Sequence, residues 1–251
     1  MIASLALLTV LACSAVTPGA APAVDSAATE PSVATKAAVP QADVPAEVLP
    51  ADTAVLFRED FSNNDQGWDL DSTSDEYGQT TREIVDGRYV LTCTGSQDYY
   101  IVLTSIPDFV EKDFILSMDV TVLENALASG DFSIEFSLRE ADGIAGRHYA
   151  FIFYNDATSY GEVWPTGNYE DLISLWENES NSAIKLEPDV KNTVRIEAIG
   201  TTFSVYINDQ LVRTVTDSTI LDAGEASINL ALNTPGQTVK VAFDNLVITK
   251  P

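Results

Sequence analysis

From Val55 to the end of the chain, apolar and polar residues alternate with a period of two. Such alternation predicts half-buried β-strands, and turn-forming residues separate the runs at roughly the 8–12-residue spacing typical of all-β domains. No stretch has a sustained helical period. Many short antiparallel strands in one domain predict an all-β fold, a two-sheet antiparallel jelly-roll sandwich. We expect strands over 55–61, 82–85, 88–94, 99–104, 114–123, 132–139, 148–154, 159–164, 169–176, 193–199, 203–207, 210–216, 226–233 and 238–249.

The beginning of the chain has a different pattern. Residues 2–12 are apolar and uncharged, which is too short to span a bilayer and fits the core of a signal peptide. The sequence Val10-Leu11-Ala12-Cys13 resembles the lipobox of bacterial lipoproteins, which implies that Cys13 carries the lipid. The positive charges that usually precede such a segment are missing. Two alternatives stay open: cleavage after Ala21-Pro22-Ala23, which gives a free secreted protein, and a retained helix.

Residues 14–52 are rich in Ala, Pro, Val, Thr and Ser and contain no aromatic residue. Such a segment cannot bury enough apolar area to offset the entropy of ordering it. We therefore expect three parts: a signal peptide over 1–13, a disordered linker over 14–52, and one folded domain over 53–251.

The chain is strongly acidic, with a formal net charge of −25. Four acidic residues and one lysine lie in the first 50 positions, so the rest carries 34 acidic and 12 basic side chains. A domain with this charge repels nucleic-acid phosphates and anionic lipid headgroups. We therefore expect no nucleic-acid partner, and attachment to a membrane only through a covalent lipid anchor.

Cysteine and histidine are scarce. If Cys13 is lipidated, Cys93 has no partner, and its place among alternating apolar residues predicts a buried, inert thiol. His148 is the only histidine of the chain. These counts exclude a disulfide framework and disfavour a zinc site or histidine-based catalysis.

Several segments resemble the concanavalin A-like lectin/glucanase superfamily, which includes laminin G-like and 3-keto-disaccharide hydrolase domains. The resemblance extends over about residues 55–249 and implies the fold more firmly than a function. The segments that carry it are 57–62 (FREDFS) with Gly67-Trp68, 194–200 (VRIEAIG), 203–212 (FSVYINDQLV), 214–217 (TVTD) and 241–248 (VAFDNLVI).

One departure concerns the turn between two late strands. The family usually has Asn-Gly there, and this chain has Asn208-Asp209. Two residues between alternating runs predict a β-hairpin. Because aspartate tolerates the left-handed conformation less well than glycine, we expect a looser turn.

An aromatic-rich stretch is the candidate ligand site. Tyr160, Glu162 and Trp164 share one strand face, and Glu170 and Trp176 are expected nearby on the next strand. Sugars stack on exposed aromatic rings, and polar neighbours then fix their orientation. The resemblance implies that this face belongs to the concave sheet of the sandwich. The alternative is that these aromatic residues form part of the core.

A structural calcium ion is a second expectation, since jelly rolls of this kind often hold one between their first and last strands. Asp60 and Asp244 are the matching acids, and backbone carbonyls could complete the six to eight oxygen ligands that calcium needs. The alternative is that both acids cap turns.

Catalysis has weaker support. Laminarinase-type members of the superfamily carry Glu-x-Asp-x-x-Glu on one strand, and this chain has Glu135, Ser137 and Glu140 in those positions. Strict alternation places the two glutamates on opposite faces unless a β-bulge intervenes. For the 3-keto-disaccharide hydrolases, the chain shows no motif that identifies a catalytic set.

The sequence thus predicts a non-catalytic binding domain for a glycan or another extracellular polymer, lipid-anchored at the cell envelope. Two alternatives stay open: a glycoside hydrolase of the 3-keto-disaccharide type, and a protein-interaction or structural module.

Overall fold

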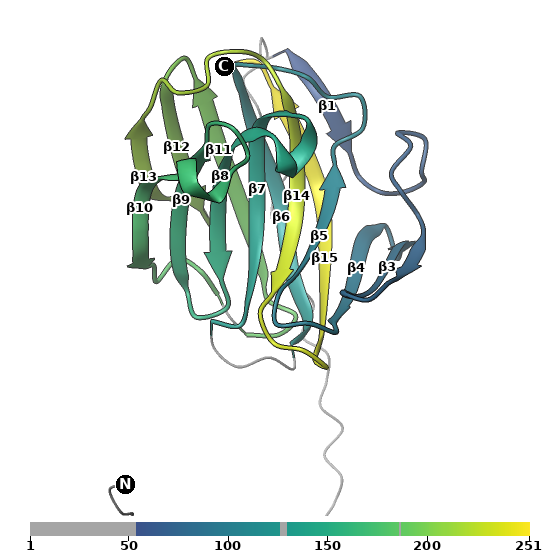
Figure 1. Ribbon diagram of the computed structural model, residues 1–251. Coiled ribbons are helices and arrows are strands. Elements are labelled where there is room, and N and C mark those ends of the chain that lie inside the picture. The colour runs from purple at the N-terminus through teal and green to yellow at the C-terminus, as the bar shows by residue number, and fades with distance from the viewer. Residues whose placement is uncertain (1–53, 126–129, 186) are drawn as a thin grey trace, which may run out of the picture. The chain divides into compact units, whose positions relative to one another are not determined.

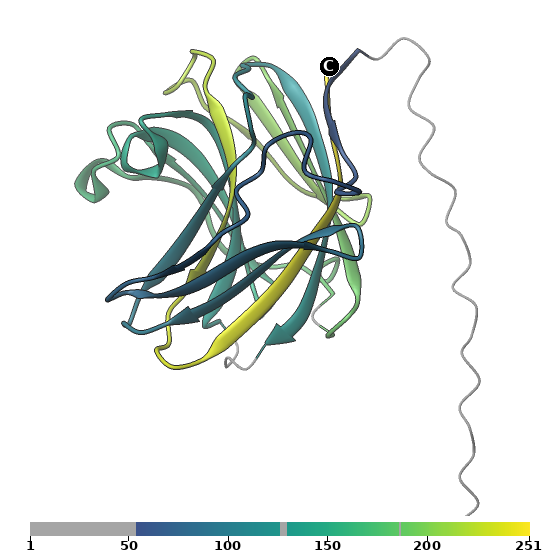
Figure 2. The ribbon, with the colours of Figure 1, turned by 90° about the vertical axis from the view of Figure 1, so that its right-hand side faces the viewer.

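A computed structural model describes residues 54–125, 130–185 and 187–251. The predicted signal peptide, Cys13 and the 14–52 linker lie outside the described residues. In the described part of the chain, no helix is long and apolar enough to cross a membrane. Two antiparallel sheets form two layers, which Figure 2 shows from the side.

The larger sheet has nine strands in the described residues, and β1 pairs with β15 outside the main order β13-β12-β11-β6-β15-β4-β3-β2. Its strands are β1 (Val55–Glu59), β2 (Ser72–Ser74), β3 (Gly78–Val85), β4 (Arg88–Gly95), β6 (Phe114–Asn125), β11 (Lys191–Ile199), β12 (Thr202–Ile207), β13 (Gln210–Thr216) and β15 (Thr238–Thr249).

The smaller sheet has the order β10-β9-β8-β7-β14-β5 and faces the viewer in Figure 1. Two short 3₁₀ turns, η1 (Gly143–Ala145) and η2 (Tyr169–Asp171), flank its strands. These strands are β5 (Tyr100–Ser105), β7 (Phe132–Ala141), β8 (Arg147–Tyr154), β9 (Thr158–Trp164), β10 (Ile173–Ser180) and β14 (Glu225–Leu232).

Alternating apolar side chains of both sheets fill the space between them. Phe136 and Leu138 of β7 and Leu116 and Met118 of β6 are among the buried residues of this single core. Burial of each such side chain stabilises the fold by roughly 1.5–3 kcal/mol. The predicted jelly-roll sandwich is therefore confirmed.

Cys93 of β4 is fully buried, and Thr80 of β3 contacts its sulfur. Burial raises the pKa of the thiol to about 12. The predicted burial of the Cys93 thiol is confirmed.

The strand prediction misses one strand, β2, and places the start of β10 too early. β2 was not expected, since three residues are too few to show alternation. The strand predicted over 169–176 begins only at Ile173, because the turn η2 precedes it. Asn168 caps that turn by accepting a hydrogen bond from the Glu170 N–H.

The β12–β13 hairpin has both turn residues in the left-handed region, with φ 51° at Asn208 and 62° at Asp209. The Asn208 side chain stabilises the turn through three hydrogen bonds. It accepts from the Thr193 N–H and donates to the carbonyl of Ala183 and the side chain of Asn192. Asn208 thereby fixes a turn in which Asp209 adopts a conformation that favours glycine.

We expect Asp209→Gly to raise the free energy of unfolding by about 0.5–1 kcal/mol, because glycine adopts this φ without the cost of a Cβ. Urea denaturation measures the change. Asp209→Ala is the control and should lower stability, since alanine lacks the local hydrogen bonding that lets aspartate tolerate positive φ. Equal stability of the two variants would contradict the explanation.

Candidate functional site

The outer face of the six-stranded sheet carries a continuous set of polar and aromatic side chains. The core-facing residues of each strand alternate with them. We call this set the polar face. Its members are Glu135, Ser137 and Glu140 of β7, His148 and Tyr154 of β8, Tyr160, Glu162 and Trp164 of β9, and Ser227 and Asn229 of β14.

A β-bulge in β7 brings both glutamates onto this face. The register of β7 shifts between Leu138 and Ala141 against β8, and Arg139 has a positive φ of 54°. The extra residue breaks the strict alternation of the strand. Arg139 therefore turns into the core, and Glu140 turns outward beside Ser227. The arrangement on opposite faces, which strict alternation predicts, does not occur.

Arg139 fixes this bulge from the core side. Its guanidinium donates to the carbonyls of Ile220 (2.8 Å) and Gly200 (2.7 Å), and Nε donates to the carbonyl of Lys112 (3.1 Å). It also lies 4.9 Å from the centre of the Phe203 ring. A fully buried cation with these partners holds several chain segments at one point.

Hydrogen bonds connect the outward side chains of β7 and β14. Glu135 Oε1 accepts from Ser137 Oγ (2.6 Å) and Asn229 Nδ2 (3.1 Å). Glu140 Oε1 accepts from Ser227 Oγ at 2.7 Å. The two glutamates are only 6% and 3% exposed. The carboxylates are thus held in place, and these bonds leave Oε2 of each unused.

Burial shifts the pKa of four ionisable groups of the polar face, and it raises that of Tyr154. Burial raises the pKa of Glu140, and the nearby Glu135 raises it further. Burial also raises the pKa of Glu162, with Glu135 and Glu177 adding to the effect. Burial lowers the pKa of His148, which is therefore uncharged at neutral pH.

Glu140→Gln tests this electrostatic description. A raised pKa means that the folded protein holds the proton more tightly than the unfolded chain does. The free energy of unfolding therefore falls as the pH rises above the ordinary value of 4.5. The variant should therefore be more stable than the wild type at pH 7, with a higher Tm.

Thermal unfolding at several pH values measures this difference, which should vanish under acidic conditions where Glu140 is protonated. Glu76→Gln, at an exposed loop position, is the control and should show no such dependence. A destabilised Glu140→Gln protein at pH 7 would contradict the description.

Trp164 forms a platform at one end of the polar face. Its ring stacks on His148 at 5.6 Å with an interplanar angle of 12°, and its Nε1 donates to Glu162 Oε2 at 3.2 Å. Tyr169 is 77% exposed, and the centre of its ring lies 6.0 Å from the centre of the Trp164 ring. Tyr160 packs edge-on against Tyr154 farther along the same strands. Tyr160, Glu162 and Trp164 thus share one face, as the alternation predicts.

The structure does not place Trp176 on the polar face. A register shift between Ser174 and Trp176 in β10 turns the ring inward, where it is 4% exposed and stacks on Phe151. We therefore exclude Trp176 from the candidate ligand-binding residues. Glu170 is exposed in η2, next to Tyr169.

No protein-family model matches the chain, and no curated protein sequence is similar to it. Solved structures share its fold. A GH16 protein from Bacteroides ovatus, in complex with a G4G4G3G product, has 11% identity and a TM-score of 0.58 over 77% of this chain and 99% of its own. A laminarinase catalytic domain from Thermotoga petrophila has 10% identity and a TM-score of 0.54. That match covers 79% of this chain and 98% of the laminarinase domain. A protein with a galectin-like fold from Bacillus subtilis has 11% identity and a TM-score of 0.55. That match covers 78% of this chain and 96% of the Bacillus protein.

The domain shares the jelly-roll sandwich fold of these structures. At these identities the likeness shows the fold alone. Within that fold, sequence reasoning missed the contribution of β14 to the polar face. The signal was present, since Ser227 and Asn229 alternate with the buried Ala226, Ile228 and Leu230.

The two acids predicted to bind calcium have different hydrogen-bond partners and different burial. Asp60 is exposed and accepts from the Ser62 N–H, which lowers its pKa. Asp244 accepts from the Asn245 N–H, and burial raises its pKa. Among the described residues, no group of three or more His, Cys, Asp or Glu side chains is arranged to hold a metal. Structural calcium stays a prediction.

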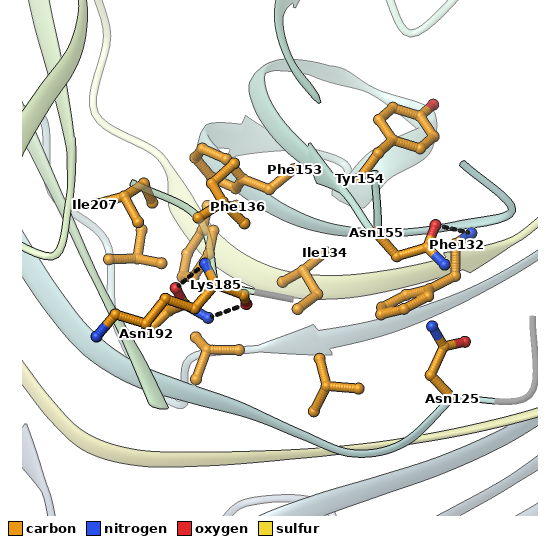
Figure 3. A pocket seen from close by; sticks show the side chains of 14 residues that line it. Asn125, Phe132, Ile134, Phe136, Phe153, Tyr154, Asn155, Lys185, Asn192 and Ile207 are labelled. Atoms are coloured by element: carbon orange, nitrogen blue, oxygen red, sulfur yellow. Dashed lines mark hydrogen bonds between the residues drawn. The ribbon is translucent and has the colours of Figure 1, made fainter. Parts of the chain in front are cut away.

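A cavity of about 50 Å³ lies between the sheets (Figure 3). Its wall is mostly apolar, and the Asn192 side chain at its rim is bonded to the backbone of Lys185. Its small volume leaves no room for a sugar ring, so the polar face is the better candidate. The pocket is lined by Val120, Val122, Asn125, Phe132, Ile134, Phe136, Phe153, Tyr154, Asn155, Ile184, Lys185, Asn192, Val194 and Ile207.

Proposed function

We propose that the polar face binds an extracellular glycan without cleaving it, in a domain that a lipid on Cys13 tethers to the cell envelope. The observation that carries this proposal is the half-buried Trp164 ring, held by His148 and Glu162 beside fixed carboxylates. A fixed aromatic ring offers a stacking surface at low entropic cost, and oriented polar groups supply selectivity.

Two further points support the proposal. Ser137 stands where the laminarinase-type motif has an aspartate, so the catalytic triplet of that motif is incomplete. The solved structures of the same fold include a laminarinase domain and a GH16 protein with a bound product. These two proteins act on or hold glycans, which favours a glycan over a protein partner.

We expect Trp164→Ala to weaken the binding of a soluble glycan at least tenfold, since loss of an aromatic anchor commonly costs more than about 1.4 kcal/mol. Isothermal titration calorimetry with a panel of β-glucans and other soluble polysaccharides measures the change. The matched control is Tyr77→Ala, which removes an exposed ring before β3 in the other sheet.

Full binding by Trp164→Ala would show that the site lies elsewhere. If the wild type binds no member of the panel, the proposal fails, and a protein-interaction role gains support.

One observation favours a second candidate, a retaining glycoside hydrolase. The bulge at Arg139 puts Glu135 and Glu140 on one face, and the pKa of Glu140 is raised, as a general acid requires. Glu140 would protonate the leaving oxygen while the Glu135 carboxylate forms a bond to the anomeric carbon. Water, deprotonated by Glu140, would then release the sugar and free Glu135.

Release of reducing ends from a bound glycan tests this candidate. Turnover that Glu135→Gln and Glu140→Gln each abolish, with binding retained, would establish the hydrolase. Binding without turnover by the wild type would establish the non-catalytic function. No catalytic set for a 3-keto-disaccharide hydrolase is apparent among the same side chains.

A further inference from the structure

The polar face has an excess of hydrogen-bond acceptors. Glu135 and Glu140 each use Oε1 for the bonds described above, and Glu162 accepts from the Trp164 indole. Ionised carboxylates are acceptors only. A ligand that meets this face must therefore supply donors.

The face also has an excess of negative charge. In the described part of the chain, no salt bridge involves Glu135, Glu140 or Glu162. The two arginines nearest in sequence have other partners: Arg139 points into the core, and Arg147 pairs with Asp222. His148, the remaining basic group here, is uncharged at neutral pH for the reason given above. The carboxylates thus lack a cation.

Asn229 provides an independent observation. Its side chain is fully buried on the outward side of β14, with Nδ2 bonded to Glu135 and Ser137. Its carbonyl oxygen Oδ1 has no hydrogen-bond donor among the described residues. A buried carbonyl without a donor costs about 1–3 kcal/mol, and a donor brought by a ligand, after a small adjustment of the side chain, would recover part of that cost.

We propose that the polar face selects glycans that carry free amino groups, over their N-acetylated and neutral counterparts. This inference rests on the proposed glycan-binding function and names the ligand class for the same site. An ammonium group brings one positive charge and three donors to a site that has unused acceptors and, among the described residues, no paired cation. The Trp164 ring beside Glu162 adds a favourable surface for a cation.

The experiment compares three hexasaccharides that differ in the substituent at C2: β-1,4-linked glucosamine, N-acetylglucosamine and glucose. Each is titrated into the full chain at about pH 6, where the amines are largely protonated. We expect the glucosamine hexamer to bind at least tenfold more tightly than the other two. This selectivity should decrease as salt is added, because the attraction is partly screened.

Variants separate the site from the general negative charge of the domain. Glu162→Gln and Glu135→Gln should each weaken glucosamine binding severalfold, and both substitutions preserve the shape of the side chain. Glu162 is only half-buried, so its variant is expected to fold even if Glu135→Gln does not. Glu76→Gln removes the same charge from an exposed loop and is the matched control.

Glucosamine selectivity that the polar-face variants lose and Glu76→Gln keeps would support the inference. Equal binding of the three hexamers would overturn it and leave the glycan-binding function standing. An equal loss in Glu76→Gln would also overturn it, since the attraction would then be non-specific. Absence of binding by all three hexamers and by the β-glucan panel would overturn both proposals.

Discussion

Replacing Arg139 by methionine is expected to lower the free energy of unfolding by about 3–5 kcal/mol, because the change leaves several buried carbonyls without a donor. The carbonyls of Lys112, Gly200 and Ile220 lose their guanidinium partner. Methionine also cannot repeat the contact with Phe203 that the guanidinium plane makes. Chemical denaturation of the two proteins measures the difference.

Arg139→Lys is the informative control for this variant. Lysine keeps the charge but lacks the planar fork that reaches several carbonyls at once. We expect an intermediate loss of stability, with methionine the more harmful change. If the methionine protein were as stable as the wild type, the buried guanidinium would not be what holds the bulge.

Gly161→Ala is expected to cost about 2–4 kcal/mol, a range typical of overpacking in a core that cannot relax. A Cβ at this position would lie 1.9 Å from the Trp176 ring, so the indole or the strand must move. The ring is sandwiched between β9 and Phe151 and has little room to do so. The Tm of the purified variant reports the loss.

The control for Gly161→Ala is Gly95→Ala, where the nearest atom would lie 3.4 Å from the new Cβ. We expect a loss below about 1 kcal/mol there. Combining Gly161→Ala with Trp176→Leu should cost less than the sum of the two single changes, since the leucine side chain leaves space for the methyl group. Strict additivity would show that the two positions do not interact.

The fold could be predicted because alternation fixes which side of each strand is buried. The same rule placed Tyr160, Glu162 and Trp164 together, since they lie two residues apart in one regular strand. It failed for β2, whose three residues show no period, and for 169–176, where the capping by Asn168 delays the strand.

The rest of the site depends on irregularities and on pairings between distant strands. One extra residue at Arg139 reverses the side on which Glu140 lies, and a register shift in β10 turns Trp176 inward. The contact between Asn229 and Glu135 joins strands more than 90 residues apart. A local pattern in the sequence contains neither a bulge nor the identity of a neighbouring strand, so these features required the structure.

The reactivity of the buried Cys93 thiol can be used to measure how often the sandwich opens. With a pKa of about 12 and no exposed surface, the sulfur is neither ionised nor reachable in the closed sandwich. Thiolate is the reactive form, so a thiol-specific dye can modify Cys93 only in molecules whose β3–β4–β15 region has separated. The labelling rate would then follow the population of opened molecules, and a bound ligand would slow it in proportion to its occupancy.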